Sequence, residues 1–86
     1  MTEARDVRLR RLKMRSWRRG TKEMDMILGP FFDASSGDLS DETLDHYETL
    51  LDENDQDLYQ WVSGQIEPPA QFSVLVGTIR TYALSS

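Results

Sequence analysis

The chain has 86 residues, no cysteine and a formal net charge of −5. This length leaves room for one domain with a modest core and excludes a two-domain enzyme. Without cysteine there is no disulfide framework, thiolate nucleophile or cysteine-based zinc site. No apolar run approaches the roughly 20 residues that would span a bilayer, and no secretory signal is recognisable at the start, so we expect a mature, soluble protein.

Charge changes sign abruptly along the chain. Up to Glu23 there are nine basic and three acidic side chains, a net +6, whereas the rest of the chain holds one basic and twelve acidic side chains, a net −11. The change falls at residues 18–25, Arg-Arg-Gly-Thr-Lys-Glu-Met-Asp, which we call the seam. The chain is therefore an electrical dipole with a glycine at its seam.

A first helix is predicted over residues 3–18, which contain no Pro or Gly and many helix formers. Its apolar side is narrow, with Leu9, Leu12 and Ser16 on one face. Gly20 then stands at the C′ position, where a left-handed backbone ends a helix at little cost. Thr21 can cap the next helix, so the seam is predicted to be a tight corner between two helices.

Three further helices are predicted from capping residues and helical spacing, and the first of them follows the seam directly. In this second helix Pro30 lies within the apolar pattern, so we expect a kink or an early stop near Gly29. Ser40 caps the third, which ends around residues 52–54. Either Asp55 or Asn54 can cap a short fourth, which runs from about residue 56 to 63. The predicted buried residues of helices two to four are Met24, Ile27, Leu28, Phe31, Leu44, Tyr47, Leu51, Leu58, Trp61 and Val62.

A fifth helix follows the rigid Pro68-Pro69 entry and carries the clearest apolar stripe in the chain. The stripe consists of Phe72, Leu75, Val76, Ile79 and either Tyr82 or Ala83. No strand-period segment or hairpin signal is found elsewhere. The sequence therefore predicts an all-α protein, a compact bundle of about five short helices in one domain over residues 1–86.

No residue set points to catalysis or metal binding by this chain. His46 is the only histidine, and a lone histidine without cysteines or a second histidine is a poor metal site. The acidic run at residues 52–57 does not match the ligand positions of an EF-hand. One glycine in the seam is not a phosphate-binding loop, and no nucleophile and base are paired. We expect no enzyme activity, no bound metal and no tightly bound cofactor.

The seam allows two interpretations from its residues alone. Arg19 and Glu23 are four apart and could form only a local ion pair, with Gly20 acting only as a helix terminator. Alternatively, Gly20 lets another backbone approach closely, and Arg19 with Glu23 offers a directional contact of both signs. The basic first helix could also bind nucleic acid, although the acidic remainder of the chain would repel it. A generic helical adaptor is a further alternative.

Arg19-Gly20-Thr21-Lys22-Glu23 resembles the RGxxE motif of the succinate dehydrogenase assembly factor 2 family. The basic stretch before the motif is similar to the family's first helix, and the segment around Leu50-Leu51, Asp55, residues 57–59 and Trp61 resembles a second family stretch. The resemblance covers nearly the whole chain in order. The position after the glycine is commonly Met in the family and is Thr21 here, which bears on any apolar contact at that point.

The resemblance implies a small helical assembly factor of the chaperone type in the bacterial cytoplasm. Its partner would be the flavoprotein subunit of succinate dehydrogenase, and in some bacteria that of fumarate reductase, to which FAD becomes covalently attached. It implies a monomer that binds no nucleic acid and does not insert into a membrane, with FAD belonging to the partner. The partner-binding residues expected from the motif and its surroundings are Arg19, Gly20, Glu23, Arg15, Arg18 and Asp25.

Overall fold

A computed structural model describes residues 3–85, which form five α-helices and two short 3-10 helices without any strand. The predicted all-α fold is confirmed. None of these helices is both long and apolar enough to cross a membrane, within the part of the chain described. In chain order the elements are α1 (Arg5–Trp17), α2 (Lys22–Ser35), η1 (Ser36–Asp38), α3 (Asp41–Leu51), α4 (Asp55–Val62), η2 (Ala70–Phe72) and α5 (Ser73–Ser85).

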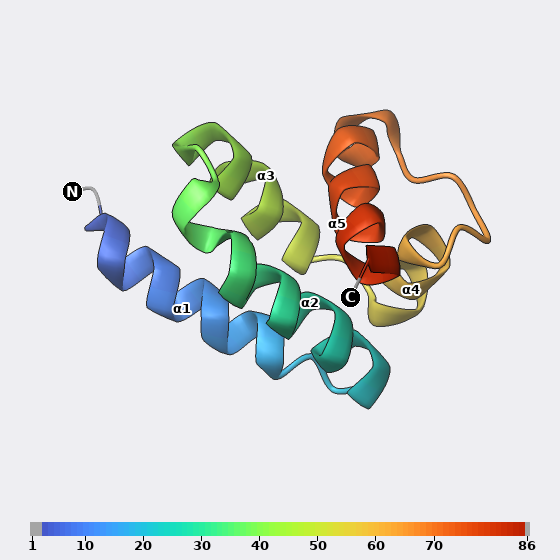
Figure 1. Ribbon diagram of the computed structural model, residues 1–86, viewed down its shortest axis with the longest axis horizontal. Coiled ribbons are helices and arrows are strands. Elements are labelled where there is room, and N and C mark those ends of the chain that lie inside the picture. Colours follow the sequence, from blue (N-terminus) through green and yellow to red (C-terminus); the bar gives the residue numbers. More distant parts are fainter. Residues whose placement is uncertain (1–2, 86) are drawn as a thin grey trace.

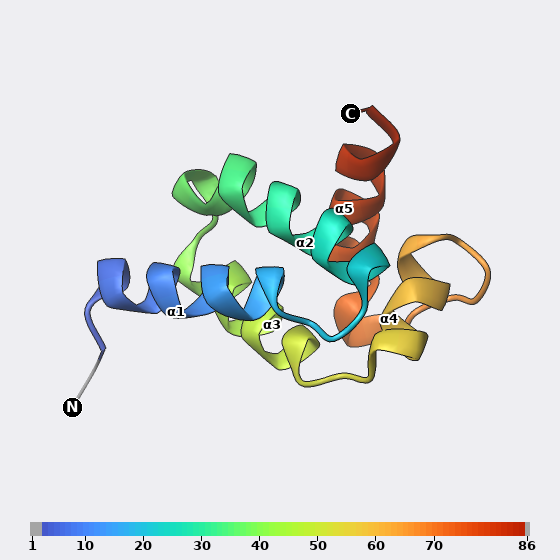
Figure 2. The same cartoon turned by 90° about the horizontal axis from the view of Figure 1, so that it is seen from below.

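Helices α1 and α2 form an antiparallel pair whose turn is the seam (Figure 1). Helix α3 lies beside this pair, and α4 and α5 pack at the end of the molecule where the seam lies. Figure 2 shows that α5 runs across the direction of α1 and α2. The seam is thus brought next to the turn between α3 and α4, a segment far from it in the sequence.

The helix boundaries follow from the predicted capping residues. The Thr21 side chain accepts a hydrogen bond from the backbone N–H of Met24 at 3.4 Å, and Ser40 accepts one from Thr43 at 3.1 Å. Asn54 caps α4 in the same way, through the N–H of Gln56 at 2.7 Å. These polar side chains satisfy amide groups that a helix start leaves without partners, so local sequence is sufficient to set where these helices begin.

Of the kink or early stop expected near Gly29, the early stop is wrong, because α2 continues through Pro30 to Ser35. Phe31 and Phe32 follow the proline and are both almost fully buried. A helix that ended at Gly29 would remove these two rings from the core. Their burial outweighs the hydrogen bond that the proline removes. Glycine before the proline also helps, since it has no Cβ to clash with the proline ring.

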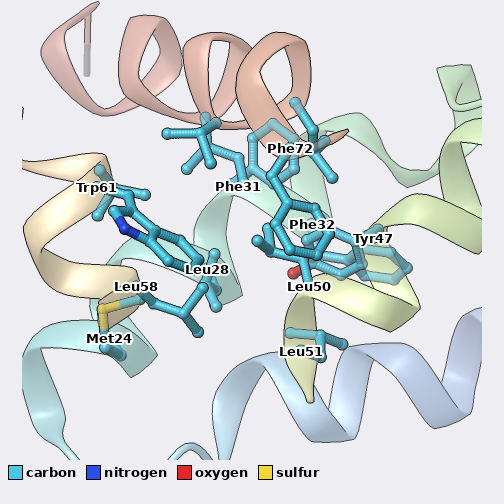
Figure 3. Close-up of a cluster of buried hydrophobic side chains, with 14 of the residues drawn as sticks. Met24, Leu28, Phe31, Phe32, Tyr47, Leu50, Leu51, Leu58, Trp61 and Phe72 are labelled. Atoms are coloured by element: carbon cyan, nitrogen blue, oxygen red, sulfur yellow. The ribbon is translucent and has the colours of Figure 1, made fainter. Parts of the chain in front are cut away.

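Aromatic rings fill the centre of the core (Figure 3). Phe32 stacks on Tyr47 with ring centroids 5.2 Å apart, and Trp61 packs against Phe72 at 6.1 Å. The Tyr47 hydroxyl is 2.6 Å from the Ser16 hydroxyl, which itself donates to the carbonyl of Leu12. Because a serine hydroxyl has only one hydrogen, Tyr47 is the donor in this pair. Burial raises the pKa of Tyr47 well above its ordinary value, which keeps the phenol protonated.

Helices α1 and α3 run parallel and are joined by a regular series of ion pairs, which we call the ladder. Each arginine of the ladder meets an acid 36 or 37 residues further along the chain. The ladder consists of Arg5–Asp41 at 2.6 Å, Arg8–Asp45 at 2.5 Å, Arg11–Glu48 at 2.8 Å and Arg15–Asp52 at 2.7 Å. The basic segment of the chain is therefore folded directly against its acidic segment.

The ladder also bears on the nucleic-acid alternative. Binding to a phosphate backbone requires basic side chains that are free to replace counterions. In this fold four arginines of the basic helix face carboxylates of α3 and its C-cap instead. The basic stripe that the sequence suggested is thus largely neutralised within the molecule, which weakens the electrostatic argument for nucleic-acid binding.

Replacing Gly29 by alanine should destabilise the fold, by about 1–3 kcal/mol as for other overpacked sites. A Cβ at Gly29 would overlap the indole ring of Trp17, so the indole would have to move. The control is Gly77→Ala in α5, where a Cβ would meet nothing within 4 Å. There the better helix propensity of alanine should stabilise by about 0.5–1 kcal/mol. Opposite signs in urea unfolding would confirm the close packing of α1 on α2, and two gains in stability would contradict it.

Protonation of the Glu48 carboxylate should contribute to the loss of folding stability in acid. Hydrogen bonds from Arg11, aided by the charges of Arg11 and Arg8, hold the pKa of Glu48 below its ordinary value of 4.5. A carboxyl with a lowered pKa in the folded state stabilises the fold above pH 4.5, and this contribution is lost as pH falls through the folded-state pKa.

Glu48→Gln should accordingly be less stable than the parent chain at pH 7, with a shallower decline in the free energy of unfolding below about pH 4.5. Glu42→Gln is the matched control, because Glu42 is an exposed acid of the same helix outside the ladder. Equal pH dependence of the two variants in urea unfolding would rule out this role for Glu48.

Candidate functional site

The seam is an exposed corner whose shape depends on one glycine. Helix α1 ends at Trp17, Arg18 is its C-cap, and Gly20 adopts a φ of +106° before α2 begins at Lys22. The left-handed backbone that the sequence predicted is confirmed. With Arg18 as the C-cap, Gly20 is at C″ and not at C′ as predicted, because α1 ends earlier than expected. Other L-residues adopt this φ only with strain, so the corner requires glycine for its shape.

Arg19 holds the corner from the inside. Its Nε donates to Oδ1 of Asp55 at 2.9 Å, while Nη1 and Nη2 donate to the backbone carbonyls of Leu51 at 2.5 Å and Glu53 at 2.9 Å. Only 10% of the Arg19 side chain is exposed. One guanidinium thus satisfies two carbonyls at and just after the end of α3 and pairs with the first residue of α4, which locks the seam to the α3–α4 turn.

Two other predicted binding residues also have partners within the molecule. Asp25 accepts a hydrogen bond from the backbone N–H of Arg19 at 2.6 Å, which fixes the path of the chain into α2. Arg15 belongs to the ladder through Asp52. The structure therefore gives Arg15, Arg19 and Asp25 clear roles in holding the seam, whereas their contact with a partner stays a prediction.

The remaining predicted residues face solvent. Arg18, Gly20 and Glu23 are all exposed around the corner. The local Arg19–Glu23 ion pair is absent, since Arg19 pairs with Asp55 instead. Glu23 has neither an ion pair nor a hydrogen bond from its side chain to any residue between positions 3 and 85. The corner therefore exposes to solvent the guanidinium of Arg18, the backbone at Gly20 and the carboxylate of Glu23.

A groove of about 510 Å³ opens beside the corner, between the start of α2 and the outer face of α4. Its lining includes Thr21, Glu23, Asp55, Asp57, Tyr59 and Gln60. The Oδ2 atom of Asp55 would lie 3.7 Å from a Cβ at Gly20, so α4 directly borders the corner. Nothing in the local sequence around the seam indicated this contribution from α4. The only signal was the second resembling segment, which contains Asp55, residues 57–59 and Trp61.

Comparison with known proteins points to one family. The family described as "Flavinator of succinate dehydrogenase" matches residues 10–83. The chain is 39% identical over 70 residues to succinate dehydrogenase assembly factor 2 of Schizosaccharomyces pombe, a match covering 81% of the chain and 50% of that protein. It is 36% identical over 65 residues to the FAD assembly factor SdhE of Acetobacter pasteurianus, covering 76% of the chain and 60% of that protein.

A third relative, succinate dehydrogenase assembly factor 2 of Mycosarcoma maydis, is 35% identical over 72 residues, which cover 84% of the chain and 30% of that protein. The matched region thus spans between 30% and 60% of the length of these relatives. No solved structure gives a significant match. The relatives are named as assembly factors and not as enzymes, in agreement with the prediction that this chain is not an enzyme.

Asp55→Asn should destabilise the fold by about 1.5–3 kcal/mol, because it removes the charged partner of a largely buried guanidinium. Asp52→Asn is the matched control, since Asp52 pairs with Arg15 in the same series but its side chain is 70% exposed. Its loss should cost below about 1 kcal/mol. The free energies of unfolding in urea test the difference, and equal losses would mean that Arg19 does not depend on Asp55.

Proposed function

The chain belongs to the family of flavinators of succinate dehydrogenase, and we propose that it is an assembly factor for the flavoprotein subunit of that enzyme. In this role it binds the subunit and promotes covalent attachment of FAD to one of its histidines. In some bacteria the flavoprotein of fumarate reductase is a second client. The chain acts as a monomer in the cytoplasm and needs no cofactor of its own.

The observation that carries this proposal is the rigid, exposed corner at Gly20. Surface that is already ordered before binding loses less conformational entropy when a partner docks. The three hydrogen bonds of Arg19 to Leu51, Glu53 and Asp55 supply that order, while Gly20 leaves the backbone open to close approach. A docking corner of this kind fits an assembly factor better than a catalyst.

The chemistry of attachment belongs to the flavoprotein in this proposal. The assembly factor binds preferentially the arrangement of the flavoprotein in which flavin and histidine are aligned, and so raises the population of that arrangement. FAD stays with the flavoprotein throughout. The groove beside the corner supports this division, because Glu23, Asp55 and Asp57 line it and would repel a diphosphate.

In cells that lack this gene, covalent flavin on the flavoprotein subunit should be strongly reduced, and the wild-type chain should restore it. Gly20→Arg should fail to restore it, because a long side chain would cover the corner. Its left-handed backbone would also be strained, by about 1–3 kcal/mol. Flavin fluorescence of the subunit in denaturing gels is the measurement.

Gly37→Arg is the matched control, because Gly37 is exposed, has no atom within 4 Å of a Cβ position and adopts no left-handed backbone. It should restore flavin attachment fully. Glu23→Ala provides a second test that leaves the backbone unstrained, paired with Glu42→Ala on the exposed face of α3. Unchanged flavin in the deletion strain would overturn the proposal and leave a generic helical adaptor as the working hypothesis.

A further inference from the structure

The basic side chains of the segment that ends at Glu23 are not equally neutralised. Seven of the nine have a carboxylate within 4.0 Å: the four of the ladder, together with Arg10, Lys13 and Arg19. Arg18 and Lys22 have none among residues 3–85, and both are exposed. These two cations stand immediately on either side of the Arg19-Gly20-Thr21 turn.

The lack of partners is informative because acids are in excess. The chain has fifteen acidic and ten basic residues, so cations are the scarcer partner in ion pairing. Unpaired acids are therefore expected on this surface, and unpaired cations are not. The two exceptions in the basic segment lie together at the corner that the proposed function assigns to docking.

Lys22 is also in an unfavourable place for the free protein. It is the first residue of α2, where the positive end of the helix dipole disfavours a cation. The two acids of that turn, Glu23 and Asp25, are well placed for the dipole, but neither pairs with Lys22. A residue that opposes its local environment without internal compensation indicates a role outside the folded chain.

We propose that Arg18 and Lys22 form a cationic clamp that receives carboxylates of the partner flavoprotein across the Gly20 corner. This inference rests on the proposed function and specifies its contact. Arg19 lies between the two cations but faces inward, so it acts as a positioning residue that fixes their spacing. The RGxxE arginine then supports docking without touching the partner.

Single carboxylates fit this clamp better than phosphates do. Arginine binds carboxylate and phosphate oxygens alike, so its chemistry alone does not decide. The surroundings do, because the adjoining groove carries Glu23, Asp55 and Asp57. A diphosphate or a nucleic-acid backbone would extend its charge over these acids, whereas a carboxylate on a protein surface can be placed on each cation alone.

The test measures affinity for the apo flavoprotein subunit, by calorimetry at two salt concentrations, together with the melting temperature of each variant. Arg18→Gln/Lys22→Gln should weaken binding about tenfold and flatten its salt dependence. Arg10→Gln/Lys13→Gln makes the same change of charge away from the corner and should leave affinity within about twofold. Equal affinity of the two double variants would overturn the clamp while leaving the proposed function intact.

Lys22→Gln alone separates a docking role from a structural one. It should raise the melting temperature by about 2 °C, because a cation leaves the helix N-terminus, while affinity for the flavoprotein falls. A loss of both stability and affinity would overturn the inference. The inference would also be overturned if the wild-type chain alone bound FAD and the double variant did not, because the two cations would then bind phosphate. If the wild-type chain does not bind the flavoprotein, the proposed function fails and the clamp with it.

Discussion

The placement of α1 against α3 depends on the match between one basic and one acidic segment at a nearly constant offset of 36 or 37 residues. From Arg5 to Arg19 each successive arginine on one side of the chain meets an acid on α3, at its C-cap or at the start of α4. Individual exposed ion pairs contribute little. Their common register nevertheless restricts how α1 can lie on α3, because rotating either helix would unpair the series and a shift by one turn would separate Arg19 from Asp55. Folding thus places the basic segment against the acidic segment and largely cancels the separation of charge seen along the sequence.

The last pair of this series, Arg19 with Asp55, is the most buried. The Arg5 side chain is 43% exposed and Arg19 only 10%. Removing one partner of a buried, hydrogen-bonded pair is costly because the other charge is left without compensation. The seam is therefore the most firmly held end of the series. The corner that carries the candidate site is held by the α3–α4 turn, and the conformation of Gly20 is maintained by contacts from elsewhere in the chain.

What the sequence could predict follows from the range of the interactions involved. Caps such as Ser40 and Asn54, and the helical spacing of apolar residues, act within a few positions, so five helices and most of the core were predictable. An early stop at Gly29, one of the two outcomes expected there, was mispredicted because the burial of Phe31 and Phe32 is a tertiary effect. The inward orientation of the Arg19 side chain could not be predicted from the local sequence either. The local rule pairs it with Glu23 four positions away, whereas its actual partner is 36 positions away.

These contacts assign different physical tasks to Arg19, Gly20 and Glu23, the residues that resemble the RGxxE motif. Arg19 turns inward and joins the seam to the α3–α4 turn, and Gly20 supplies a backbone conformation. Of the three, Glu23 alone presents to solvent a charge that has no partner among residues 3–85. A motif defined by its sequence would suggest one contiguous contact surface. The structure indicates instead that part of the motif shapes the surface that its neighbours present. Because shape and contact are carried by different residues, a loss of function at Arg19 and one at Glu23 would have different physical causes.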